Sequence, residues 1–591
     1  MGRQPYPCSG SGSRAALLLL AEVPSFGGVV RSALAIIGTT GLLLLAALTR
    51  SWSRSFTEIL KRPPGWALLA LILWGGVSFF LTPTELRGMA GAELLRLVAG
   101  GAAFLTAAYA LEPRERSVAL TGLLFLGCVI GISDFARLGR TDELGELARR
   151  NYHTASAFGT HENVGSLLAL LFPVSLGVAL WGDLPEKPRW AAYAAVLILG
   201  FAWIVARCRS AWLGGGVALL LLILLAWRTV RKSEQSRRPR DMRDKVRDAL
   251  GSPLPILIGA LLIMGIGGGL STMLSQRAAS FVNIKEDSSF QTRLIMWEGG
   301  ARMAAQKPLT GWGLASYPVM QNYWTHLGEE RWKILEDGAD HSSIAHNFYV
   351  QWAAEAGAVG VGLHLLALGS GIIFALSTMG RTRSPLDHAI LLGTTASVMG
   401  ACVDAIASPA YQFHGVYALL WALLGLGASA LGEREAPGTR FGPWPYAIAG
   451  VLALAGAVAV PLWGQSLMRS GEATKRGTFV LISDPPGPSL KPGTIVTLRA
   501  EFTDANGKTL PTLPGTTWSS PSEKESGALS ISLGELLAKD VDPPIRLSAV
   551  RLTLPEKPGA IVQVMASFTD RYGHAYTADS VFLLKGTKPA R

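Results

Sequence analysis

Apolar and polar residues alternate along this chain in long blocks rather than position by position. A helix that spans a bilayer needs roughly 20 mainly apolar residues. The pattern predicts twelve such helices, centred on residues 29–48, 66–81, 93–111, 117–133, 164–181, 190–206, 211–230, 253–274, 357–378, 388–408, 415–431 and 445–468. We therefore expect an α-helical multi-pass membrane domain over residues 28–469, preceded by a poorly defined segment, 1–27.

The C-terminal region has a different period. Residues 494–502 and 561–568 alternate between apolar and polar side chains, as half-buried β-strands do. The Asn506-Gly507 pair that follows the first run is a strong signal for a hairpin turn. Short strands and proline-rich turns predict that residues 470–591 form an all-β domain, an immunoglobulin-like sandwich.

Composition supports a membrane protein and changes the interpretation of the charge. The 591 residues are 49% apolar and only 16% charged, and the charges gather between the apolar blocks. The net charge of +12 does not require nucleic acid as a partner, because lysine and arginine collect in cytoplasmic loops beside anionic lipid. The four cysteines form no CxxC pair, so we expect neither a metal site nor a disulfide.

The distribution of lysine and arginine predicts the orientation of the spans. The loop 231–252 holds eight lysine and arginine residues and is predicted to be cytoplasmic. Counting spans forward from it places the long loop 275–345 and the C-terminal domain outside the cytoplasm. Counting backward places the N-terminus outside too, unless a further helix begins near residues 15–30, and the sequence leaves that side open.

Two arginines, Arg207 and Arg209, interrupt the apolar pattern at the predicted outer end of the sixth span. A guanidinium binds phosphate oxygens through two parallel hydrogen bonds and stays charged. Arginine at a helix end also reaches the interface without any function. Because arginine is disfavoured in short outer turns, we interpret the pair as a candidate anion site.

Two further polar segments are predicted to meet the same face. His161 and Asn163 directly precede the fifth span, where they could equally cap a helix. The loop 275–345 contains Arg293 and is followed by His346-Asn347. Histidine has an ordinary pKa close to neutral and suits a general base. Taken singly, Arg293 also fits a surface ion pair and His346 a helix cap, and the sequence leaves these alternatives open.

Four stretches, residues 159–170, 207–214, 293–313 and 346–357, together resemble the O-antigen ligase and polymerase superfamily. Its members attach or polymerise lipid-linked glycans at the outer face of the bacterial inner membrane. The resemblance implies a GT-C glycosyltransferase fold in that membrane and a glycan donor on undecaprenyl diphosphate. It implies no metal or other cofactor.

The resemblance also implies roles for individual residues. His346 would activate the acceptor hydroxyl, and Arg207 or Arg209, together with Arg293, would hold the diphosphate. The supporting residues would be Asn347, Asn163 and His161. Attack on the side opposite the diphosphate would invert the anomeric centre.

The sequence departs from the family pattern in ways that leave the acceptor open. It reads His161-Glu162-Asn163 where the family often has Asn-Pro-Asn, and Cys208-Arg209 where the family often has Ser-Arg. The added β-domain is not a general feature of the family. We expect a ligase with lipid A-core as acceptor. The alternatives are a polymerase, a protein O-oligosaccharyltransferase and, as a different class, a transporter. Transport fits less well because the ionisable residues are predicted at one face rather than at the midplane.

Overall fold

The structure is a computed structural model that describes residues 63–110, 113–138, 161–234, 288–324, 344–379, 382, 384–429, 444–470, 478–503, 522–526, 528–537, 550–569 and 575–586. The predicted spans 29–48 and 253–274, the segment 1–27 and the Asn506-Gly507 turn lie outside these residues. The chain divides into two compact units. Unit 1 consists of Met1–Pro63, Leu95–Arg277 and Gly371–Gly442, and unit 2 of Pro64–Leu94, Ala278–Ser370 and Pro443–Arg591.

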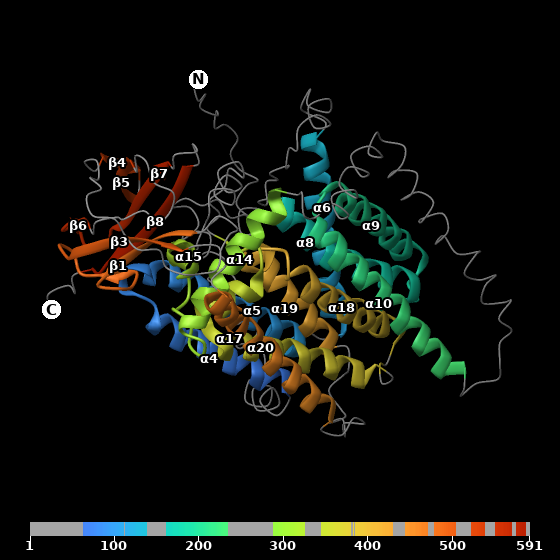
Figure 1. Cartoon of the computed structure of the whole chain (residues 1–591). Helices are drawn as coiled ribbons and strands as arrows, with labels where there is room; N and C mark the ends of the chain where they lie inside the picture. The colour runs from blue at the N-terminus through green and yellow to red at the C-terminus, as the bar shows by residue number, and fades with distance from the viewer. Residues whose placement is uncertain are drawn as a thin grey trace, which may run out of the picture. The chain divides into compact units, whose positions relative to one another are not determined.

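Most described residues are helical (Figure 1). The main helices are α4 Pro63–Leu81, α5 Arg87–Leu105, α6 Pro113–Leu138, α8 His161–Trp181, α9 Glu186–Val205, α10 Arg209–Glu234, α14 Ser288–Gln306, α15 Tyr317–Trp324, α17 Phe348–Thr378, α18 Pro385–Asp404, α19 His414–Ser429 and α20 Trp444–Ser470. Within the described residues, nine helices are long and apolar enough to cross a membrane, and α19 is a shorter apolar helix. These ten helices correspond to the ten predicted spans that the structure describes, while the total of twelve stays a prediction.

Helix α8 is the central helix of unit 1, since 83% of its apolar span is buried. It packs against α9, α10 and α18, and small residues bring these helices close together. A Cβ atom added at Gly393 of α18 would lie 2.8 Å from the Cα of Val174 on α8. One added at Gly165 of α8 would lie 2.7 Å from the Cβ of Cys208. Larger side chains at these positions would force the helices apart.

In unit 2, the segment expected as the long loop 275–345 contains two helices, α14 and α15. Helix α14 packs against α20, where a Cβ atom at Gly464 would lie 1.9 Å from the carbonyl oxygen of Ala301. The chain between α14 and α15 runs against a break in α17. At this break Gly357 has φ +66° and ψ −173°, so the helix is interrupted.

The break leaves three carbonyl groups of α17 without partners inside the helix, and tertiary contacts satisfy them. Trp312 and Gly313 donate their backbone N–H groups to the carbonyls of Ala354 and Glu355, at 3.0 and 2.8 Å. The indole Nε1 of Trp74 donates to the carbonyl of Ala356 at 2.9 Å. Buried backbone groups need such partners, so α4, the α14–α15 connection and α17 form one interlocked core.

The C-terminal strands form two sheets (Figure 1). The strands are β1 Thr478–Asp484, β2 Ser489–Leu490, β3 Ile495–Thr503, β4 Ser522–Ser526, β5 Ala528–Leu537, β6 Val550–Thr553, β7 Ile561–Thr569 and β8 Ala575–Leu584. One sheet has the order β1-β3-β6 and the other β2-β8-β7-β5-β4. Strands β3 and β7 confirm the two predicted runs. The pairs β5–β7 and β2–β8 are parallel, whereas the sheets of immunoglobulin domains are antiparallel. The immunoglobulin-like form of this domain therefore stays a prediction.

Candidate functional site

In unit 1, Arg207 lies in the tight turn that joins α9 to α10, and Arg209 begins α10. Arg207 adopts a left-handed conformation with φ 54°, which is unfavourable for a residue with a side chain. Hydrogen bonds from two tryptophan side chains stabilise the turn. The Nε1 of Trp203 donates to the carbonyl of Ala211, and the Nε1 of Trp212 donates to the carbonyl of Trp203, both at 3.1 Å. The backbone that carries both arginines is therefore held from each side.

The Arg207 guanidinium has unused hydrogen-bonding capacity. Its Nε and Nη1 atoms are buried and have no hydrogen-bond partner among the residues that the structure describes. Desolvation lowers the pKa of this guanidinium below its ordinary value. A buried cation with unused N–H groups attracts an anion that can accept those hydrogen bonds. Arg209 is half-buried two residues further on.

The first turn of α8 lies beside this arginine turn. His161 is half-buried and Asn163 is buried, and Gly165 contacts Cys208 between the two arginines. The structure therefore brings four candidate residues, His161, Asn163, Arg207 and Arg209, to the same end of unit 1. Burial, and after it the nearby Asp404 and Glu162 carboxylates, raises the pKa of Cys208 to about 12. The thiol is thus a neutral packing group here.

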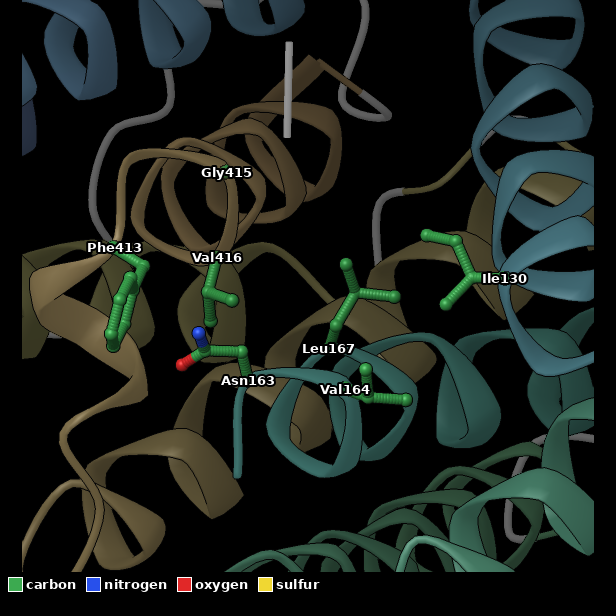
Figure 2. A pocket seen from close by; sticks show the side chains of 7 residues that line it. All are labelled: Ile130, Asn163, Val164, Leu167, Phe413, Gly415 and Val416. Carbon is green, nitrogen blue, oxygen red and sulfur yellow. The ribbon is translucent and has the colours of Figure 1, made fainter. Parts of the chain in front are cut away.

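Asn163 faces a small pocket on the other side of the first turn of α8. Six further residues line it: Ile130, Val164, Leu167, Phe413, Gly415 and Val416. Figure 2 shows the Asn163 carboxamide pointing toward Phe413 and Val416. Its Oδ1 atom is buried and has no hydrogen-bond partner among the described residues. The pocket therefore offers one hydrogen-bond acceptor inside otherwise apolar walls.

Sequence reasoning missed a buried polar cluster at this end of unit 1. Asp404, the last residue of α18, is only 1% exposed and accepts a hydrogen bond from the Tyr411 hydroxyl at 2.9 Å. The hydroxyls of Ser166 on α8 and Ser408 lie 3.2 Å apart. A carboxylate within an apolar span indicates a functional or structural site. Asp404, at the end of the apolar α18, could have been identified from the sequence in this way.

In unit 2, His346 precedes α17 in a left-handed turn with φ 50° and is half-buried. The Oδ1 atom of Asn347 accepts a hydrogen bond from the backbone N–H of Val350 at 3.0 Å. Asn347, and not His346, therefore caps the N-terminus of α17. The peptide groups of Ala345 are bonded on both sides. Its N–H donates to Gln351 Oε1 at 3.1 Å, and its carbonyl accepts from Trp297 Nε1 at 2.7 Å.

Arg293 lies on the same helix as Trp297, one turn earlier and half-buried. Residues four apart on a helix share a face, and Trp297 reaches the residue next to His346. The structure therefore brings Arg293 and His346 to the same side of unit 2. Within the described residues, no three His, Cys, Asp or Glu side chains come together as metal ligands.

Comparison with known proteins identifies one family. Residues 194–365 match the O-antigen ligase family. The matched range contains both arginines of the unit 1 turn, Arg293 and the His346-Asn347 pair, while His161, Asn163 and the strands lie outside it. A comparison with curated proteins finds no match. This match supports the O-antigen ligase superfamily, and together with the apolar helices it indicates a multi-pass membrane protein.

Proposed function

We propose that this protein transfers a glycan from undecaprenyl diphosphate to a hydroxyl of lipid A-core, or of a similar acceptor, at the outer face of the bacterial inner membrane. The match to the O-antigen ligase family supports a lipid-linked glycan donor in general terms. One observation carries the assignment to a site. The buried Nε and Nη1 atoms of Arg207 have no hydrogen-bond partner among the described residues. Diphosphate oxygens are the natural partners of such a guanidinium.

On the donor side, the chemistry needs charge stabilisation. As the bond between C1 of the sugar and the phosphate oxygen breaks, negative charge grows on the diphosphate. Fixed cations in a poorly hydrated site stabilise that charge without reorganising. Arg207 or Arg209, together with Arg293, would perform this role. The left-handed turn at Arg207, fastened by two tryptophan hydrogen bonds, keeps its guanidinium in place.

On the acceptor side, the chemistry needs a base. His346 would take the proton from the acceptor hydroxyl while the oxygen attacks C1 from the face opposite the diphosphate. The new glycosidic bond forms as the polyprenyl diphosphate leaves, and the anomeric configuration inverts. General base catalysis of this kind contributes roughly 10²–10⁴-fold. Asn347 supports the base by capping α17 directly after it, and Asn163 and His161 support the arginine turn.

The proposal includes the arrangement of the whole chain. Residues 28–469 would form the GT-C transferase domain and residues 470–591 an immunoglobulin-like domain outside the cytoplasm. A superfamily polymerase or protein O-oligosaccharyltransferase would share the donor and differ only in the acceptor. The donor-binding residues therefore do not separate these activities, and the assay below does.

The test is a transfer assay in liposomes without added metal. The protein receives an undecaprenyl-diphosphate oligosaccharide and lipid A-core, and both lipids are analysed for glycan. We expect glycan on lipid A-core with wild type and a loss of at least about 100-fold with His346→Ala. His388→Gln is the matched control, because it also removes an imidazole but at a residue with no proposed role in transfer. His388 lies in unit 1, and its Nδ1 forms a hydrogen bond with the Thr382 hydroxyl.

Other products would change the assignment. Longer glycan on the donor lipid would identify a polymerase, and glycan on an added protein acceptor an O-oligosaccharyltransferase. Unchanged donor and acceptors with wild type would contradict glycan transfer and favour transport. Full activity of His346→Ala would remove this residue as the base.

A further inference from the structure

We propose that Trp297 and Gln351 are positioning residues that hold the His346 turn in its left-handed conformation. This inference rests on the proposed role of His346 as the base. A left-handed backbone is unfavourable for a residue with a Cβ atom, so the turn at His346, with φ 50°, must be stabilised by its surroundings. Residues outside the turn supply the hydrogen bonds.

The two hydrogen bonds act on the peptide groups of Ala345, directly before the histidine. Trp297 Nε1 donates to the Ala345 carbonyl at 2.7 Å, and Gln351 Oε1 accepts from the Ala345 N–H at 3.1 Å. Ala345 itself is completely buried. The Trp297 hydrogen bond restrains the peptide plane that joins Ala345 to His346, and the Gln351 hydrogen bond restrains the plane before it. With both planes held, the backbone cannot rotate freely at Ala345, and the backbone direction from which the imidazole extends is restrained.

The Gln351 side chain is anchored in turn. Its Nε2 atom donates to Glu355 Oε1 at 3.1 Å, and the same oxygen accepts from the backbone N–H of Tyr317 at 3.3 Å. Gln351 and Glu355 are 7% and 3% exposed. A buried chain of hydrogen bonds is stiff because each member is costly to leave unpaired. The His346 turn is thereby connected to the core of unit 2.

The Trp297 side chain connects the turn to α14. Its ring packs against the buried cluster that contains Met303 and Tyr317. Arg293 lies one turn earlier on the same helix. The indole hydrogen bond therefore fixes the proposed base relative to the helix that carries a proposed phosphate-binding arginine. Loss of the indole N–H would release the base while leaving the arginine on its helix.

The experiment is a double-mutant cycle in the transfer assay, with Trp297→Phe, His346→Ala and both together. Trp297→Phe keeps an aromatic ring and removes the N–H. We expect it to lower kcat about 10-fold or more, because small misplacements of a reacting group are costly, and to leave the KM for the donor within about 2-fold. In the His346→Ala background we expect no further loss, because no imidazole remains to be positioned.

The matched control is Trp312→Phe. Trp312 is also half-buried in unit 2 and packs against the same buried cluster, but its Nε1 donates to the Met303 carbonyl at 3.0 Å and not to the residue before His346. We expect its kcat to stay within about 2-fold of wild type. Gln351→Met removes the second hydrogen bond at similar side-chain volume. We expect it to lower kcat as Trp297→Phe does. If Trp297→Phe does not fold, the kcat of Gln351→Met tests the inference instead.

Three results would overturn the inference: an unchanged kcat in both positioning variants, an equal loss in the wild-type and His346→Ala backgrounds, or an equal loss in Trp312→Phe. Wild-type activity in His346→Ala would instead show that the proposed function has failed, since no base would then need positioning.

Discussion

At the residue scale, the most informative side chain is Arg207. It is half-buried in a left-handed turn, and two of its nitrogen atoms are buried without a hydrogen-bond partner among the described residues. Leaving buried N–H groups of a cation without a partner is costly. Such an arrangement is stabilised when an anion binds, which is why we place the diphosphate here.

Arg207→Gln is expected to lower kcat/KM for the donor about 100-fold or more, since one charge-assisted bidentate contact is lost. Arg207→Lys is expected to recover only part of this loss, because an ammonium cannot reproduce the planar fork. The measurement is steady-state transfer in liposomes at varied donor concentration.

Arg189→Gln is the matched control for this prediction. Arg189 lies near the start of α9, the helix that ends just before Arg207. It is exposed and donates two hydrogen bonds to the Leu184 carbonyl. We expect its transfer kinetics to match wild type. A similar loss in both variants would mean that the effect of Arg207→Gln reflects folding rather than donor binding.

At the element scale, the break in α17 organises unit 2. Gly357 has φ +66°, and a Cβ atom there would lie 2.2 Å from the carbonyl oxygen of Leu309. The same crossing brings Gly311 against Glu355, where a Cβ atom would lie 2.4 Å from the carbonyl oxygen. Two glycines therefore allow two backbones to touch, and the helix segment that carries Gln351 and Glu355 is fixed as a result.

Gly357→Ala is expected to destabilise the protein by about 2–4 kcal/mol, because both the left-handed backbone and the contact oppose a side chain. Gly362→Ala on the same helix is the control, since its Cβ atom would meet Ala457 at an ordinary 3.4 Å. Thermal unfolding in detergent would measure both. Equal midpoints for the two variants would contradict the role assigned to Gly357.

At the scale of the whole molecule, the orientation in the membrane decides whether the candidate residues can meet a lipid-linked glycan. The orientation follows from lysine and arginine in the loop 231–252. Under this prediction, Arg207, Arg293, His346 and the C-terminal domain are expected on the side of the membrane opposite that loop.

Cysteine labelling in intact cells tests this orientation. Glu329→Cys and Ser520→Cys are expected to react with an impermeant maleimide added from outside, and Arg240→Cys only after the membrane is opened. The native cysteines are replaced by serine in all three variants, so that only the introduced thiol reacts. Reaction of positions 240 and 329 from the same side would refute the proposed arrangement.

The sequence by itself determined the long apolar helices that the structure describes. A helix satisfies its backbone hydrogen bonds internally within a bilayer, so blocks of about 20 apolar residues predicted these helices without tertiary information. Period-two alternation likewise specified β3 and β7. The candidate residues were also visible from the sequence, because Arg207, Arg209 and His346 are polar at the edges of apolar blocks.

Only the tertiary structure decided the features that depend on contacts between segments far apart in the sequence. Two adjacent glycines, Gly299 and Gly300, argue against a helix, yet α14 forms because Gly300 packs closely against Val350 and Tyr317. The hydrogen bond from Trp297 to Ala345 depends on where segments far apart in the sequence meet. Hydropathy follows from local composition and is readable along the chain, whereas these contacts join residues that are neighbours only after folding.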